Sequence, residues 1–448
     1  MRRLAVVGGG LLAMLAGGCT TYAPLPIEAD PPTLAPPIAA VLEQQAAATG
    51  RPYLALAAID LAQPLDGNAV ATLAVVNNPD LKAQRSRAGI SDAQAFAARL
   101  LPDPTFSIGA SRVLTGPDPF VDLTSALGFD LAMLRSRGIR LAQARAAAQQ
   151  VRLDLAWAEW QVAGQARIQA VRVVALDRVL ALATLSQAAT RSLLERTLRA
   201  AGRGDLAPDQ LQAARIGAYD AQERVRVAAR DLAAARFELV RLLGLPPGYA
   251  VRLAPLPPVP RLPATAALFA LARARADLRA LEAGYAAQEA VVRKAILDQF
   301  PTFGIAINGA RDSAGNALVG PVVDLTLPLW NRNRGGIAIE RATRAALKAD
   351  YDARLFQTRA EIAAAVSGIA VADAQRAAIA RDLPALRTFA AASRRAAARG
   401  DLAPATAETA EQAVRDKESL ATEIDQDIAE RMIALELLTG TPEKDWPR

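Results

Sequence analysis

The sequence predicts a mainly α-helical chain with a smaller amount of β-structure, built from two copies of one unit. A six-residue segment, Arg203-Gly204-Asp205-Leu206-Ala207-Pro208, returns unchanged 196 residues later as Arg399-Gly400-Asp401-Leu402-Ala403-Pro404. Hydrophobic residues make up 52% of the chain and aromatic residues only 4%, which is typical of long, closely packed, alanine-rich helices. Two pairs of short segments alternate apolar and polar residues, as strands do. These observations predict duplicated halves with long helices and four strands per chain.

Shorter matches fix the extent of the repeat. Pro104-Thr105-Phe106 returns as Pro301-Thr302-Phe303, and Asp130-Leu131 returns as Asp324-Leu325, at nearly the same offset. The predicted organisation therefore has two repeats joined by a proline-rich linker in which no helix can continue. Its segments are repeat 1 at 67–244, the linker at 245–263, repeat 2 at 264–440 and a C-terminal tail at 441–448.

Each repeat is expected to contain a very long helix. In repeat 1 the spacing predicts a first helix over 68–101 and a long helix over 138–201. In repeat 2 the corresponding helices are predicted over 266–299 and 336–398. At 1.5 Å per residue each long helix is on the order of 95 Å, and charged residues interrupt its apolar stretches, so neither is expected to cross a membrane. Helices of this length are stable when they pack lengthwise in a coiled-coil-like array.

The alternating segments predict one β-hairpin in each repeat, at 104–132 and 301–328. The period of two gives each strand an apolar face and a polar face. Strands of about 8–10 residues are long enough to cross a membrane when tilted. A soluble antiparallel sheet that caps a helical bundle would show the same alternation.

If the hairpins cross a membrane, more than one chain is required. Four strands cannot close a barrel, and an open sheet edge in lipid leaves backbone groups unpaired. Two chains would supply eight strands, and three would supply twelve. With the apolar residues facing lipid, polar residues are predicted to face a water-filled lumen, namely Thr105, Ser107, Asp130, Thr302, Asn308 and Asp324.

The N-terminus has the layout of a secretory signal. Arg2 and Arg3 precede an apolar run that ends in small residues before Cys19, the only cysteine. This arrangement resembles a bacterial lipobox, although Leu15 lies four residues before the cysteine instead of three. We therefore expect a signal peptide at 1–18, lipid attachment at Cys19 and an extended tether over 19–66, with a plain signal peptide as the alternative. In bacterial lipoproteins an aspartate directly after the modified cysteine commonly signals retention in the inner membrane, so Thr20 at this position favours an outer-membrane location.

Composition excludes several other functions. The chain has no histidine and one cysteine, so it lacks the usual ligands of a transition-metal site and the usual proton carrier of acid–base catalysis. We expect no enzyme activity, no metal and no cofactor. Although the net charge is +7, basic and acidic residues are interleaved without a basic block, so no nucleic-acid partner is expected.

The order of these segments resembles the TolC family of outer-membrane efflux proteins, in its lipid-anchored branch. The resemblance is carried by Asn77-Asn78-Pro79-Asp80-Leu81, by Leu101-Pro102-Asp103-Pro104 entering a strand, and by Leu327-Pro328-Leu329-Trp330 leaving one. It implies a homotrimer that shares a 12-stranded barrel in the outer membrane. A periplasmic α-helical barrel of about 100 Å would continue that barrel. The implied function is the passive exit duct of a tripartite efflux pump or type I secretion system. Its partners would be a periplasmic adaptor, an inner-membrane transporter and the outer-membrane lipid.

The resemblance assigns adaptor contact to the two duplicated turns. Their predicted contact residues are Arg203, Gly204, Asp205, Leu206, Arg399, Gly400, Asp401 and Leu402. The glycines would end a long helix, the aspartates could cap the next helix, and Pro208 and Pro404 suit its first turn. The same residues could also be turns without a partner.

Two further points stay open at the level of the sequence. Many family members carry aspartates six and nine residues after the turn glycine, where this chain has Gln210 and Ala213, and Thr406 and Thr409. Glu408 and Glu411 lie nearby at a shifted phase, so cation binding at a closed aperture does not carry over. The alternative function is a periplasmic adaptor or a helical scaffold lipoprotein.

Overall fold

The computed structural model describes residues 22–27, 29, 34–49, 59–112, 115, 121–256, 261–311 and 315–447. Met1–Pro36 and Pro37–Arg448 are two separate compact units, and the second contains every helix and strand discussed below. The predicted signal peptide and Cys19 lie outside the described residues.

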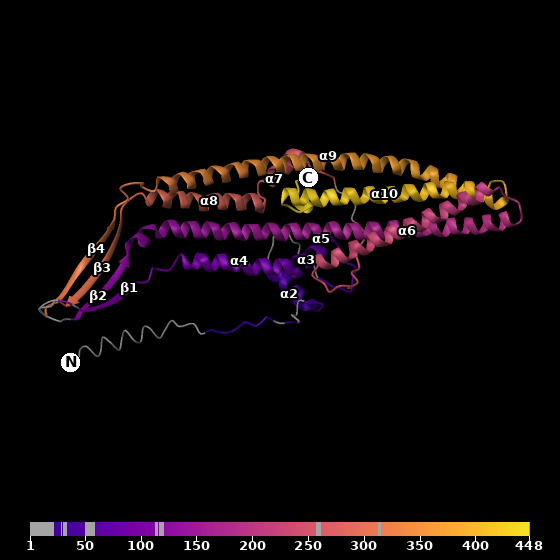
Figure 1. The fold of residues 1–448 in the computed structure, drawn as a ribbon. Helices are drawn as coiled ribbons and strands as arrows, with labels where there is room; N and C mark the ends of the chain where they lie inside the picture. Colours follow the sequence, from indigo (N-terminus) through magenta and orange to yellow (C-terminus); the bar gives the residue numbers. More distant parts are fainter. Residues whose placement is uncertain are drawn as a thin grey trace. The chain divides into compact units, whose positions relative to one another are not determined.

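The second unit contains the same series of elements twice (Figure 1). Each series runs through two short helices, a β-hairpin, a long helix, a turn and a medium helix. The first comprises α3 (Gly67–Asn77), α4 (Pro79–Ala97), β1 (Thr105–Arg112), β2 (Val121–Asp130), α5 (Leu131–Gly202) and α6 (Pro208–Leu242). The second comprises α7 (Thr265–Ala272), α8 (Ala276–Leu297), β3 (Thr302–Arg311), β4 (Ala317–Thr326), α9 (Arg334–Arg399) and α10 (Pro404–Thr439). α2 (Ala39–Thr49) precedes the first series, and a short 3₁₀ helix, Glu443–Asp445, follows the second. The predicted fold class, with duplicated halves of long helices and paired strands, is confirmed.

The single first helix predicted for each repeat is wrong, because each repeat has two helices there. In the first repeat the break lies at Asn78, whose extended backbone (ψ 124°) precedes Pro79. Proline lacks a backbone N–H and disfavours a helical residue before it. In the second repeat Arg275 is likewise extended (ψ 141°), although no proline follows it.

The long helices are longer than the sequence suggested. α5 has 72 residues and α9 has 66, so at 1.5 Å per residue they span about 100 Å. α5 starts seven residues before the predicted Gly138, immediately after β2, because Asp130 Oδ1 accepts a hydrogen bond from Met133 N at 2.9 Å and caps the helix.

The four strands form one antiparallel sheet in the order β1-β2-β3-β4. Strands β2 and β3, from different halves of the chain, pair directly, so the sheet joins the two repeats. Within this chain β1 and β4 are edge strands, each with one side unpaired.

The helices form an array that is four helices wide along its length. Near the sheet the packing order is α4–α5–α8–α9, and toward the turns it is α6–α5–α10–α9. The turns lie at the end of this unit opposite to the sheet (Figure 1). The array has two open edges, one formed by α4 and α6 and the other by α9, because neither α4 nor α6 packs along α9.

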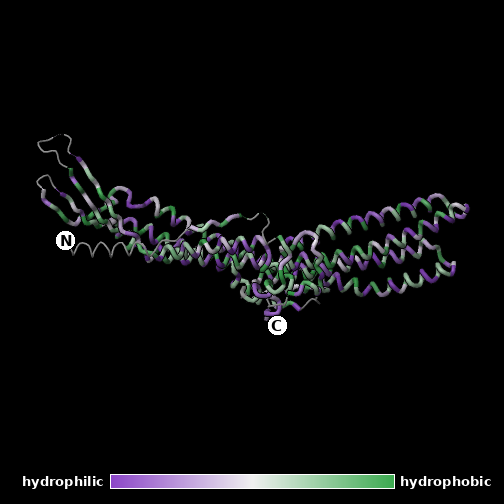
Figure 2. The backbone as a smooth tube through the Cα atoms, turned by 90° about the horizontal axis from the view of Figure 1, so that it is seen from below, coloured by the Kyte–Doolittle hydropathy of each residue, from purple (hydrophilic) through white to green (hydrophobic). Residues whose placement is uncertain are grey.

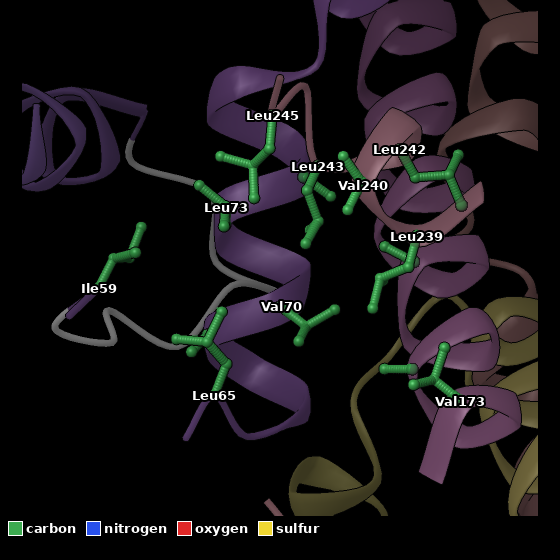
Figure 3. Packing of buried hydrophobic residues seen from close by; sticks show 14 of the residues in the cluster. Ile59, Leu65, Val70, Leu73, Val173, Leu239, Val240, Leu242, Leu243 and Leu245 are labelled. Atoms are coloured by element: carbon green, nitrogen blue, oxygen red, sulfur yellow. The ribbon is translucent and has the colours of Figure 1, made fainter. Parts of the chain in front are cut away.

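Each repeat has its own apolar core where its helices meet. In the first, leucine and valine side chains of α3 pack against α5 and the end of α6 (Figure 3). Leu65, just before α3, forms backbone hydrogen bonds with Arg252 O and Ala254 N, both at 2.9 Å, which tie the N-terminal segment to the chain that follows α6. The second core joins α7, α9 and α10 and includes Trp446.

One helix of the described chain, α9, has a stretch apolar enough to cross a membrane by length and composition alone. Hydrophilic and hydrophobic residues nevertheless alternate along the long helices (Figure 2). Ion pairs join α9 to α10 through Arg376–Asp425 at 2.6 Å and Arg387–Glu418 at 2.7 Å. We therefore assign α9 to the helical array.

Candidate functional site

The sheet places the six predicted lumen residues on one face. The register pairs Ser107 with Ala126 and Ala126 with Asn308, and it pairs Thr302 with Thr326. Since residues in register share a face and alternate residues along a strand do so too, the six side chains lie on the same side. We call this side the polar face; it includes Thr105, Ser107, Asp130, Thr302, Asn308 and Asp324, and by the same register Asp122.

The opposite side of the sheet, the apolar face, consists mostly of large hydrophobic residues. These side chains are exposed in the single chain, among them Phe106 at 69% and Ile108 at 75%. The others include Leu123, Phe129, Phe303, Ile305, Ile307, Val319, Val323 and Leu325. A contiguous exposed apolar surface of this size marks a membrane or protein interface.

Two carboxylates of the polar face lie near its helical end. Asp130 and Asp324 both pair with Gly304, on either side of it. Asp130 has a second role because one of its oxygens caps α5, whereas Asp324 has no such bond. A β-carbon at Gly109 or Gly128 would lie 2.7 Å from the hydroxyl of Thr124 or Thr105, so these glycines leave room for threonine hydroxyls on this face.

The two duplicated turns have the same backbone geometry. Gly204 and Gly400 adopt the left-handed region, with φ of 81° and 82°. The next residue returns its N–H to the helix, from Asp205 to Ala200 O at 3.0 Å and from Asp401 to Ala396 O at 2.9 Å. This is the hydrogen-bond pattern of a Schellman motif, which satisfies carbonyls at a helix end and favours glycine.

The predicted capping role of the aspartates in these turns is wrong. The N-cap residues of α6 and α10 are Ala207 and Ala403, and neither helix has a side-chain cap. Instead Asp205 accepts a hydrogen bond from Arg203 at 2.8 Å, and Asp401 accepts one from Arg399 at 2.9 Å. Each aspartate stands two residues before the alanine at the N-cap, and it pairs instead with the arginine two residues before itself. All four side chains are more than half exposed.

A groove of about 1010 Å³ lies between the two turn-bearing hairpins. It is lined by α5, α6 and the start of α10, and it contains Leu206, whose side chain is partly buried. The four positions where the family pattern places aspartates also line it, namely Gln210, Ala213, Thr406 and Thr409. The structure thus brings these positions together, but with neutral side chains.

The nearby acids at shifted phase, Glu408 and Glu411, both pair with Arg415, and Glu408 also lines the groove. Arg415 forms a short ion pair with Glu408, contacts Glu411 at 3.7 Å and donates from Nε to Ser186 Oγ at 2.9 Å. Burial raises the pKa of Glu408, and the positive charge of Arg415 opposes that rise. This cluster links α10 to α5, one helix from each hairpin.

A second polar cluster lies between the halves and was not predicted from the sequence. The fully buried Arg275 donates to both oxygens of Asp277, at 2.9 and 2.7 Å, and to Leu438 O at 3.2 Å. Its guanidinium also lies 4.6 Å from the ring centroid of Trp157 on α5. The available signal was Arg275 standing two residues before Asp277, at the position equivalent to Asn78.

The part of the chain that the structure describes has no group of three or more His, Cys, Asp or Glu residues arranged to hold a metal ion. The arrangement offers instead a two-faced sheet, two open edges and two exposed turns. These are features of assembly and passage.

Comparison with known proteins points to one family. Residues 269–441 match the outer membrane efflux protein family. No curated protein sequence matches the chain.

Several solved structures share the fold. The outer-membrane channel OprN has a TM-score of 0.72 at 17% identity, over 93% of this chain and 98% of that one. The Campylobacter jejuni CmeC outer membrane channel has a TM-score of 0.72 at 14% identity, over 84% and 85%. The open state of the Neisseria gonorrhoeae MtrE outer membrane channel has a TM-score of 0.70 at 18% identity, over 83% and 88%.

Proposed function

We propose that this chain, in which residues 269–441 belong to the outer membrane efflux protein family, is the outer-membrane exit duct of a tripartite efflux pump or type I secretion system. Three copies would share one barrel and one helical tube, and the duct would be passive. The observation that carries the proposal is the pair of open edges: the sheet ends at β1 and β4, and the helical array ends at α4 and α6 on one side and at α9 on the other.

The edges of the array carry apolar residues at matching heights. Ile216 and Tyr219 lie eight and eleven residues after Pro208, the first residue of α6. Phe389 lies ten residues before Arg399, the last residue of α9. All three are at least 60% exposed in the single chain. An α6 edge of one copy packed on the α9 edge of the next would bury them, and a head-to-tail contact of this kind gives a closed ring when the rotation between copies divides a full turn evenly.

The strands support the same assembly. An unpaired strand edge in hydrocarbon costs several kcal/mol for each open backbone group, so β1 and β4 require partners if the apolar face meets lipid. Pairing β4 of one copy with β1 of the next satisfies both edges. The family resemblance supports three copies, which would give twelve strands with the polar face around a wet lumen.

The turns are the proposed adaptor contact. Arg203 and Arg399 are exposed and held in the same orientation by Asp205 and Asp401, while Leu206 and Leu402 are partly buried beside them. Two identical surfaces per chain would give six around a trimer. A periplasmic adaptor that joins the duct to an inner-membrane transporter would meet this end, which lies opposite to the sheet.

The proposed location is the outer membrane, with the helices extending into the periplasm. Lipid attachment at Cys19 would add an anchor to the barrel, and it is supported by the sequence before that cysteine. We propose no catalytic step and no cofactor.

The test of this function changes the turns without changing the edges. The double variant Leu206→Asp/Leu402→Asp should abolish export of a fluorescent efflux substrate from cells, while the trimer still forms in the outer membrane. Because these leucines are partly buried, the exposed pair Arg203→Ala/Arg399→Ala is tested beside it and should also reduce export. The control Arg279→Ala/Arg293→Ala changes exposed arginines of α8, an inner helix of the array, and should export normally. Normal export by both turn variants would contradict the adaptor contact.

A further inference from the structure

The charged residues of the four strands are sorted by sign between the two faces of the sheet. The described strands contain five charged residues. By register, Asp122 pairs with Ser111, and Asp130 and Asp324 pair with Gly304, so all three acids lie on the polar face. Arg112 pairs with Val121 and Arg311 pairs with Ala317, which places both arginines on the apolar face.

Both arginines stand at the same end of the sheet. Arg112 is the last residue of β1 and Arg311 is the last residue of β3, so each adjoins a hairpin loop at the end farthest from the helices. Both side chains are exposed, and within the described residues neither forms a hydrogen bond or ion pair. A charge is costly at the lipid-facing midplane of a barrel, and this cost falls close to zero at the membrane boundary.

The opposite end of the apolar face carries aromatic residues. Phe106 and Phe303 are the second residues of β1 and β3, and Phe129 is the last but one of β2. Phe303 and Arg311 are eight residues apart, which is about 26 Å along a strand. At a tilt near 40° this distance, together with the reach of the arginine side chain, matches the ~25 Å apolar band of a membrane barrel.

We propose that Arg112 and Arg311 bind the phosphate groups of lipid in the outer leaflet, and that they fix the depth of the barrel in the membrane. This inference rests on the proposed function. A guanidinium presents a planar set of donors that suits two phosphate oxygens at once. Three copies would place six such groups around the outer rim, while the aromatic residues mark the inner boundary.

The ligand of the two arginines is inferred from the face of the sheet on which they lie. Cargo in the lumen would meet the polar face and its carboxylates, not these guanidinium groups. A polyphosphorylated lipid headgroup lies at the level and on the side where both arginines project, and it offers the opposite charge.

The test uses the full-length protein in phosphatidylcholine nanodiscs that contain diphosphoryl, monophosphoryl or dephosphorylated lipid A. Native mass spectrometry measures the lipid A that stays bound, and channel conductance is recorded after the same protein is transferred to planar lipid bilayers. Wild type should bind the diphosphoryl form most tightly. The variant Arg112→Gln/Arg311→Gln should lose this preference, with affinity lowered about tenfold or more, as expected for charged hydrogen bonds. The control Arg279→Gln/Arg293→Gln has the same change in net charge on the inner helix α8 and should bind as wild type does.

A further variant tests whether the site prefers a negatively charged ligand. Asp312 follows Arg311 in the sequence and lies outside the described residues. Asp312→Asn should leave binding unchanged or tighten it, whereas weaker binding would contradict the assignment.

The remaining outcomes are distinguishable. A conducting trimer whose glutamine variant keeps the lipid preference overturns this inference and leaves the proposed function intact. Displacement of lipid A by millimolar inorganic phosphate identifies a small-anion site and also overturns it. A monomer that does not conduct overturns the proposed function together with the inference.

Discussion

Asn78 and Arg275 occupy equivalent positions in the two halves, 197 residues apart, and hold the end of the last helix of their own half. Asn78 Nδ2 donates to Leu242 O at 3.0 Å, and Arg275 Nη1 donates to Leu438 O at 3.2 Å. Only the arginine brings a charge into the core, and Asp277 and Trp157 accommodate it. The duplicated fold has therefore kept one hydrogen bond while the side chain that forms it has changed.

This difference leads to a prediction at Arg275. Arg275→Met should lower the free energy of unfolding by about 1–3 kcal/mol, because it removes two of the three side-chain hydrogen bonds that Asp277 accepts and leaves Arg354 as its remaining partner. Thermal unfolding followed by circular dichroism measures the effect. The control Arg293→Met changes an exposed arginine of α8 and should unfold as wild type does. Equal melting of the two variants would contradict a stabilising role for the buried arginine.

Residues of this kind were not predictable from the sequence. The duplicated Arg-Gly-Asp segments were found because identity between two stretches is visible in the letters. Arg275 is one of 52 basic residues, and its position, equivalent to Asn78 and two residues before Asp277, does not show that its side chain is fully buried. Burial depends on Trp157, which lies in the other half of the chain.

At the scale of elements, the strands were predicted well and the helix boundaries less well. Alternation identifies a strand and its faces directly, so the six polar residues were correctly grouped on one side. Helix periodicity continues across a short break, so the interruptions at Asn78 and Arg275 were missed. The sequence did not predict that Asp130 caps α5, because this residue is also the last residue of strand β2.

The duplicated turns give a prediction about glycine. Gly204→Ala and Gly400→Ala should each destabilise their turn by about 1–2 kcal/mol, because both residues are left-handed and a β-carbon there meets no other atom, so only backbone strain counts. Hydrogen exchange of the turn amides measures this loss.

The matched control is Gly202→Ala, at the last residue of α5, where the backbone is helical and no atom lies within 4 Å of the new β-carbon. This change should leave the turn amides as protected as in wild type, or more so. Equal exchange in all three variants would argue against the left-handed requirement.

At the scale of the whole molecule, a single chain leaves strand edges and apolar surfaces exposed that another copy could cover. The sheet has two free edges, its apolar face is exposed, and the helical array ends in exposed aromatic and aliphatic residues. The sequence predicted the need for several chains, because four strands cannot close a barrel. It could not predict which helices form the edges, since that depends on the packing order of α6, α5, α10 and α9.

The edge helices give a prediction about assembly. Phe389→Asp should prevent or weaken assembly, because Phe389 is 63% exposed in one chain and would be buried against α6 of the next. Size-exclusion chromatography with light scattering measures the number of copies. Phe389→Leu keeps an apolar side chain and should assemble normally. An unchanged assembly in the aspartate variant would place the contact between copies elsewhere.

The most direct measurement of the central claim is native mass spectrometry of the protein extracted from outer membranes in mild detergent. The account predicts three copies, each beginning at a lipid-modified Cys19. A water-soluble monomer without lipid would contradict it, because the apolar face and both edges would then be stable without partners.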